Sequence, residues 1–185
     1  SGVNVGLIET LRAMYDTDRY LELVHRLDRD TSGLLLVARR ASTLRSLHGL
    51  LRSNGVDKRY LCLVSGRWPA HLKRVDAPLE KFALPSGERR VKVAATGRQS
   101  LTTFRVVTRW PSMTLVEAKP VTGRTHQIRV HCQHAGFPIL GDAKYADDAA
   151  DRLAEKLRLK RLFLHAASLS FRLEEQNYSL PAALP

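Results

Sequence analysis

Residues 25–33 read His-Arg-Leu-Asp-Arg-Asp-Thr-Ser-Gly and lead into the apolar run Leu-Leu-Leu-Val-Ala at 34–38. Another apolar segment, residues 21–24, precedes them, so we expect two short strands joined through a Thr-Ser-Gly turn. Asp28 lies in this connection beside two arginines, and nearby opposite charges favour the ionised form of a carboxyl group. An ionised Asp28, held rigidly at the rim of a strand, can act as a nucleophile or as a base. A solvated salt-bridge loop is the structural alternative.

The remainder of the chain mixes helical and strand patterns without regular alternation. Apolar periodicity predicts helices at residues 6–15, from Ser42 as N-cap to near Gly55, at 125–135 and at 150–158. Strand patterns cover residues 60–64, 90–94, 101–108, 113–118 and 163–171, in addition to 21–24 and 34–38. Because the order does not repeat a strand–helix–strand unit, we predict an α+β fold with a large mixed, mostly antiparallel sheet and flanking helices.

Length and charge limit the classes of function. The 185 residues are enough for one domain with a sizeable core. The 30 Lys and Arg exceed the 18 Asp and Glu, and the net charge of +12 favours a polyanionic partner, nucleic acid first. A membrane partner is disfavoured, because no apolar run reaches spanning length and no basic amphipathic helix has an aromatic face. The two cysteines, Cys62 and Cys132, fit a reducing cytoplasm better than a disulfide framework.

Basic residues occur in clusters along the chain. These clusters are residues 39–40, 58–59, 73–74, 89–92 and 156–161. A single cluster of this kind is usually solvated surface, but together with the net charge they predict an RNA-contacting face. Such contacts set affinity and its dependence on salt, and they do not select a sequence.

Four segments, in this order, resemble the motifs of the pseudouridine synthases of the RluA/RluC/RluD group. They are residues 25–33, Lys-Arg-Tyr at 58–60, Val-Thr-Gly-Arg-Thr-His-Gln-Ile-Arg-Val-His at 121–131 with Gly-Asp-Ala-Lys-Tyr at 141–145, and Arg-Leu-Phe-Leu-His-Ala at 161–166. The details are most similar to the RluC type, which modifies large-subunit ribosomal RNA. The resemblance implies the pseudouridine synthase fold with a central RNA-binding cleft. It also implies isomerisation of uridine to pseudouridine, with neither a metal nor an organic cofactor.

The resemblance also implies a domain organisation. Residues 1–185 are expected to be the catalytic domain, trimmed at both ends and without the N-terminal S4-type RNA-binding domain of RluC-like relatives. We expect a cytoplasmic monomer whose partner is large-subunit ribosomal RNA, with no membrane and no obligatory protein partner.

Three residues receive catalytic roles from the resemblance. Asp28 is the nucleophile, and splitting the reaction through a covalent intermediate suits uracil, which is a poor leaving group. Whether Asp28 attacks C1′ of the sugar or C6 of the base stays open. Arg124 pairs with Asp28 and keeps it ionised. Tyr60 stacks on the extruded uracil.

Four further positions are expected to bind substrate or RNA: Arg26, Lys58, Ile128 and Arg129. Arg26 matches a position that enters the RNA stack when the base leaves, and an ordinary surface ion pair explains it equally well. Ile128 forms an apolar wall of the base pocket or simply packs beside Cys132 on a buried helix face. Arg129 is either structural or an RNA contact.

A metal site is not predicted, although histidines and a cysteine crowd residues 126–134. His126 and His131 are five residues apart, so they do not share one face of a helix as ligands four apart do. Two other functions remain open. One is a metal-dependent phosphodiesterase built on the carboxylates of Asp28, Asp30 and Asp142, and the other is a non-catalytic RNA-binding module.

Overall fold

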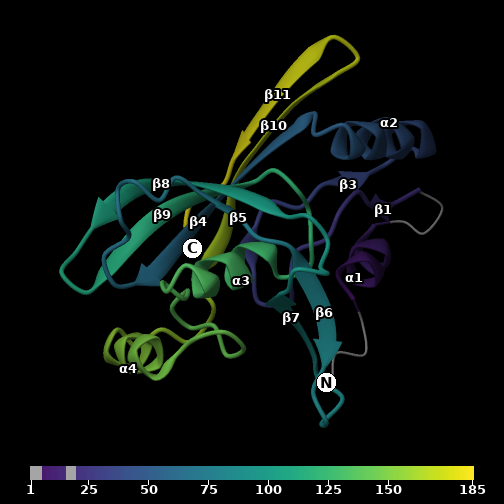
Figure 1. The fold of residues 1–185 in the computed structure, drawn as a ribbon. Helices are drawn as coiled ribbons and strands as arrows, with labels where there is room; N and C mark the ends of the chain where they lie inside the picture. The colour runs from purple at the N-terminus through teal and green to yellow at the C-terminus, as the bar shows by residue number, and fades with distance from the viewer. Residues whose placement is uncertain (1–5, 16–19) are drawn as a thin grey trace.

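The computed structural model describes residues 6–15 and 20–185, and its centre is a seven-stranded sheet (Figure 1). The strands are β2 (Ser32–Gly33), β4 (Val56–Ser65), β5 (Arg74–Asp76), β8 (Leu101–Arg109), β9 (Met113–Pro120), β10 (Leu164–Leu173) and β11 (Gln176–Pro181). Their order is β11-β10-β4-β9-β8-β5, with β2 joined to β10. The pair β2–β10 is parallel and the five other pairs of this sheet are antiparallel. The predicted α+β fold with a mostly antiparallel sheet is therefore confirmed.

Two small sheets and four helices complete the described part of the chain. The small sheets pair β1 (Glu22–Leu23) with β3 (Val37–Ala38), and β6 (Leu79–Ala83) with β7 (Arg89–Val93). The helices are α1 (Leu7–Met14), α2 (Ala41–Arg52), α3 (Gln127–His134) and α4 (Asp148–Lys156). Figure 1 shows the β6–β7 hairpin projecting away from the large sheet below α3. No helix among the described residues is both long and apolar enough to cross a membrane.

The main core lies between α3 and one face of the sheet. Side chains alternate between the two faces of a strand, and β4 contributes Cys62 and Val64 to this core. Val116 of β9 and Cys132 of α3 pack in the same cluster. Leu63 points to the opposite face of β4 and packs in a second cluster with α4. The strand β4 is therefore buried on both faces, and it forms a rigid support for residues at its beginning.

The loop that carries Asp28 is fixed to the large sheet through β2. Leu34 donates its backbone N–H to the carbonyl of Ala166 at 3.0 Å. Gly33 has a φ of +105°, and a Cβ at this position would overlap the Ala166 backbone. His25 orients the other end of the loop, because its Nε2 accepts the N–H of Leu36 at 3.1 Å. The rigid attachment expected for Asp28 is thus present.

The predicted helices occur within a few residues of their expected bounds, with two corrections at their starts. Arg40, and not Ser42, is the N-cap of α2, and its side chain makes no capping hydrogen bond. The helix predicted from residue 125 starts at Gln127, because His126 adopts a left-handed conformation. The predicted domain boundary at residue 1 lies outside the described residues.

Candidate active site

A cavity of about 680 Å³ lies where the Asp28 loop, the start of β4 and the start of α3 meet. All seven residues that were predicted to be catalytic or to bind substrate or RNA line it: Arg26, Asp28, Lys58, Tyr60, Arg124, Ile128 and Arg129. Three segments that are far apart in the sequence therefore converge on one site. The predicted central cleft is present, and its size is in the ordinary range for a cavity that takes a small organic group.

Asp28 faces the guanidinium group of Arg129. Arg129 Nη1 lies 3.6 Å from Asp28 Oδ2, and the side chain of Asp28 is 26% exposed whereas that of Arg129 is 4% exposed. Arg129 also donates from Nε and Nη2 to the two carboxylate oxygens of buried Asp142, at 2.8 and 2.6 Å. Burial opposes the charge of Arg129, but the hydrogen bonds and charge of Asp142 outweigh it, so the pKa of Arg129 is raised. A permanently charged, rigidly held cation is therefore directed at Asp28.

This geometry corrects the expected pairing of Asp28 with Arg124. The side chain of Arg124 donates from Nε to the carbonyl of Gln99 at 3.2 Å, in a hydrogen bond that is exposed to solvent. The ion pair on Asp28 comes from Arg129 instead, five residues further along the chain. The reason is the turn before α3, which directs Arg124 to the rim of the cavity and leaves the first turn of the helix facing the Asp28 loop.

The turn at residues 122–126 is held by the buried side chain of Gln127. Its Oε1 accepts the Thr122 hydroxyl at 2.7 Å and the Arg124 N–H at 3.0 Å. Its Nε2 donates to the carbonyl of Leu101 and to the hydroxyl of Thr102, both at 3.0 Å. All four hydrogen-bonding positions of the amide are used, so the turn is fixed to β8 without a mobile partner.

Tyr60 and Lys58 lie on one face of β4, because residues two apart in a strand point to the same side. Burial, with a contribution from the charge of Asp28, raises the pKa of Tyr60 to about 12. The phenol is therefore protonated at neutral pH, and Tyr60 is one of the residues that line the cavity. Burial lowers the pKa of Lys58.

Arg26 and Ile128 both line the cavity, but Arg26 is exposed and Ile128 is buried. Arg26 is exposed at the rim, and the described residues offer it no ion-pair partner, which does not support the simple surface-pair alternative. Ile128 is 7% exposed and packs in the same core cluster as Cys132 while it also lines the cavity. The packing beside Cys132 is therefore present, and the contact of Ile128 with a base stays a prediction.

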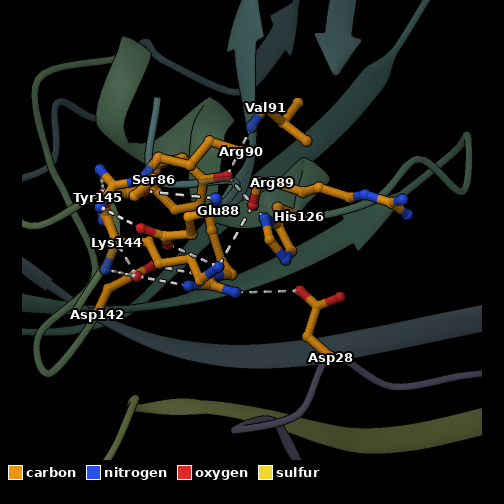
Figure 2. Close-up of polar contacts among 11 residues, drawn as sticks. Asp28, Ser86, Glu88, Arg89, Arg90, Val91, His126, Asp142, Lys144 and Tyr145 are labelled. Atoms are coloured by element: carbon orange, nitrogen blue, oxygen red, sulfur yellow. Dashed lines mark hydrogen bonds and ion pairs between the residues drawn. The ribbon is translucent and has the colours of Figure 1, made fainter. Parts of the chain in front are cut away.

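Two residues at the site had no chemical role in the sequence-based interpretation, His126 and Tyr145. His126 Nδ1 lies 2.7 Å from the Tyr145 hydroxyl. The buried Tyr145 accepts the N–H of Val91 at 2.9 Å, and the carbon at the centre of the Arg129 guanidinium lies 5.0 Å from the centre of its ring (Figure 2). Tyr145 is the last residue of the Gly-Asp-Ala-Lys-Tyr segment at 141–145, and this motif was the sequence feature that could have indicated a role for it at the site.

The arrangement does not provide the carboxylate site that a metal-dependent phosphodiesterase needs. Within residues 6–15 and 20–185, no group of three or more His, Cys, Asp or Glu side chains is placed to hold a metal ion. Asp142 is 1% exposed and gives both oxygens to Arg129. His131 likewise has both ring nitrogens in contact with protein groups, Thr102 Oγ1 at 2.9 Å and the Ala77 carbonyl at 3.0 Å.

Comparison with known proteins gives a consistent result. Residues 8–134 match the family described as RNA pseudouridylate synthase. The chain is 56% identical over 173 residues to the ribosomal large subunit pseudouridine synthase C of Escherichia coli strain K12, covering 92% of this chain and 54% of that protein. It is 54% identical over 171 residues to the Haemophilus ducreyi protein of the same name, covering 92% and 53%. The chain thus spans about half the length of the curated relatives that it matches.

Solved structures show a similar fold. The structure of human RNA pseudouridylate synthase domain containing 1 superimposes with a TM-score of 0.79 at 26% identity, covering 96% of this chain and 73% of the human chain. That of human RNA pseudouridylate synthase domain containing 4 has a TM-score of 0.74 at 28% identity, covering 97% and 76%.

Proposed function

The chain belongs to the RNA pseudouridylate synthase family, and we propose that it isomerises uridine to pseudouridine in large-subunit ribosomal RNA. The two curated relatives named above are ribosomal large subunit pseudouridine synthases, which supports this substrate. The described residues would form one catalytic domain that acts as a monomer in the cytoplasm. The net charge of +12 suits a ribosomal RNA partner, because basic residues neutralise phosphates.

The observation that carries the proposal is the pairing of Asp28 with buried Arg129 at the cavity wall. In the reaction, the bond between C1′ and N1 breaks and a bond between C1′ and C5 forms. The hydrogen of C5 leaves to solvent, and N1 gains a proton. A carboxylate nucleophile divides this change into two easier steps. Arg129 would hold Asp28 in one rotamer until substrate arrives.

The other cavity residues suit an extruded nucleotide. A base that reacts at its ring and sugar must leave the RNA stack, and the enzyme compensates by stacking it on a side chain. Tyr60 would provide this aromatic face, and Ile128 the apolar wall beside it. Arg26 at the rim would take the place of the base in the stack, while Lys58 and Arg124 would contact phosphate.

The test of this function is the substitution Asp28→Asn, which keeps the shape of the side chain and removes the nucleophile. Unmodified large-subunit ribosomal RNA is incubated with each protein, and pseudouridine is mapped by carbodiimide-dependent stops of reverse transcription. Wild type should produce discrete new stops, and the Asn variant should produce none while it binds the RNA with wild-type affinity in a filter assay. Turnover by a folded Asp28→Asn protein would remove Asp28 from the mechanism, and RNA binding without turnover by wild type would favour a non-catalytic module.

A further inference from the structure

His126 has an unusual backbone conformation for a residue with a side chain. Its φ is 52° and its ψ is 19°, in the left-handed region, and it occupies the N-cap of α3 without a side-chain cap. Residues in this region are strained unless they are glycine, and such strain persists only where the surroundings fix it, often at functional sites. His126 lines the same cavity as Asp28.

The hydroxyl of Tyr145 fixes which ring nitrogen of His126 carries hydrogen. This hydroxyl accepts the Val91 N–H at 2.9 Å, and it lies 2.7 Å from His126 Nδ1. Among the described residues, His126 Nδ1 is the acceptor available to the hydrogen of the hydroxyl group. Burial raises the pKa of Tyr145, so the hydroxyl keeps that hydrogen at neutral pH. His126 Nδ1 is then an acceptor, and the hydrogen of the neutral ring resides on Nε2.

The Nε2–H group of His126 faces the cavity. Figure 2 shows the second ring nitrogen on the side where Asp28 lies, and the described residues provide it with no hydrogen-bond partner. Four charges surround the ring: Asp28 and Asp142 favour protonation, and Arg129 and Lys144 oppose it. Burial is the largest influence, and the net effect lowers the pKa of His126. The ring is therefore neutral at neutral pH, with a single donor of fixed direction.

We propose that His126 is a substrate-contacting residue whose Nε2–H donates a hydrogen bond to a carbonyl oxygen of the extruded uracil, and that Tyr145 is the positioning residue that holds this tautomer. The proposal rests on the proposed function, because it concerns the same cavity. Uracil has two carbonyl oxygens that can accept. An uncharged donor beside Asp28 does not neutralise the nucleophile, whereas another cation would. A donor fixed before substrate enters also needs no reorganisation during the reaction.

Kinetics of three variants test the contact, measured as release of tritium from RNA labelled at C5 of uridine. His126→Leu should lower kcat/KM about tenfold, the value of one hydrogen bond, with little change in overall RNA affinity. His126→Gln places an amide N–H near the former Nε2 and should retain most of the activity. Tyr145→Phe keeps the ring packed against Arg129 but no longer fixes the tautomer of His126, so its activity at pH 8 should fall to a level between those of wild type and His126→Leu. The loss is partial because only some of the neutral rings then carry hydrogen on Nε2.

Two further measurements distinguish a contact from a merely structural role. Nitrogen-15 NMR of the histidine rings should show hydrogen on Nε2 alone for His126 in wild type, and a mixture of tautomers in Tyr145→Phe. Transcripts with 2-thiouridine or 4-thiouridine replace one carbonyl by the poorer acceptor sulfur. On one of these transcripts wild type should lose turnover, and His126→Leu should lose several-fold less, because the missing contact cannot be lost twice.

The outcomes separate this proposal from the function on which it rests. A wild-type protein that releases no tritium overturns the proposed function itself. An active wild type with a folded His126→Leu variant of equal kcat/KM overturns the role of His126, and a folded His126→Gln variant that is as slow as His126→Leu overturns the role of the donated hydrogen bond. Equal losses on both thio-substituted transcripts for wild type and His126→Leu overturn the contact with uracil, and hydrogen on His126 Nδ1 in wild type overturns the role of Tyr145.

Discussion

The guanidinium of Arg129 contacts two carboxylates, and its burial determines what its loss would do. Removing one partner of a buried ion pair leaves the other charge without compensation, at a cost of about 3–5 kcal/mol. We therefore expect Arg129→Ala to lower the free energy of unfolding by this amount, because Asp142 is buried against it. Arg124 is half-buried and makes no ion pair among the described residues, so it should tolerate Ala within about 0.5 kcal/mol.

Activity separates the two arginines more sharply. Arg129→Lys keeps the charge but cannot form two parallel hydrogen bonds to Asp142, so Asp28 loses its fixed partner. We expect turnover of ribosomal RNA to fall far more in Arg129→Lys than in the matched control Arg124→Lys, and denaturant unfolding verifies that both fold. If Arg124→Lys is the inactive variant, the pairing that the sequence motif suggested is the functional one.

Tyr60 offers a comparison between the two parts of one side chain. Tyr60→Phe keeps the aromatic face, and Tyr60→Leu loses both the face and the hydroxyl. If stacking is the whole role, Phe should retain binding and Leu should lose about 1–3 kcal/mol of it, measured with a uridine-containing RNA. Slow turnover by Tyr60→Phe with normal binding would add proton transfer by the hydroxyl. Wild-type binding and turnover by Tyr60→Leu would place the tyrosine outside the base pocket.

At this scale the sequence predicted which residues meet, but not how they pair. Each of the seven predicted positions lines the cavity. Arg129, and not Arg124, pairs with Asp28. This pairing depends on the left-handed backbone of His126 at the start of α3, which no local sequence pattern indicates. Tyr145 was part of a recognised segment, yet its role depends on Val91, which lies 54 residues earlier in the chain.

Among the secondary-structure elements, the short strand β2 matters most for the site, because it joins the Asp28 loop to β10. Gly33 has a positive φ, and a methyl group there would overlap the backbone of Ala166. We expect Gly33→Ala to lower the free energy of unfolding by about 1–3 kcal/mol, the range for overpacking, and to reduce turnover further by displacing Asp28.

Gly49, in the middle of α2, is the matched control for that substitution. A Cβ at Gly49 would meet no atom within 4 Å, and alanine is the better helix former. Gly49→Ala should therefore stabilise the protein by about 1 kcal/mol with unchanged turnover. Thermal unfolding measures the stability of both variants, and tritium release measures their turnover. A Gly33→Ala protein with wild-type stability and activity would show that β2 does not hold the Asp28 loop in place.

The sequence predicted long elements better than short ones. The strands β8 and β9 alternate between buried and less buried side chains, and the helices α1, α2 and α4 are amphipathic, which a local pattern can reveal. The strand β11 is largely polar, and it pairs with β10 at the edge of the sheet. The strands β2 and β5 have two and three residues, so they exist only through their partners. Such pairing is a property of the assembled sheet and not of the segment.

The molecule as a whole shields several histidines partly or fully from solvent, which disfavours their charged form. Burial is the largest influence on His25, His126 and His131, and each has a lowered pKa. Below the ordinary histidine pKa of 6.5, these side chains bind protons in the unfolded chain but not yet in the folded chain. The free energy of unfolding therefore decreases as the pH falls through this range. The contribution of these histidines to the free energy of unfolding should therefore not change with pH above about pH 7.5. It should decrease as the pH falls through 6.5 toward 5. Each histidine can contribute up to about 1.4 kcal/mol per pH unit.

Urea unfolding at pH 8, 6.5 and 5 measures this slope. The window ends at pH 5 because Asp57 and Glu88 have lowered carboxyl pKa values, and the stability that they contribute is lost at more acidic pH. The most informative variant is His131→Leu, since both ring nitrogens of His131 contact buried protein groups. It should be less stable than wild type at pH 8 and lose less stability between pH 8 and 5. A slope that is unchanged in His131→Leu would mean that this histidine is protonated without penalty in the folded protein.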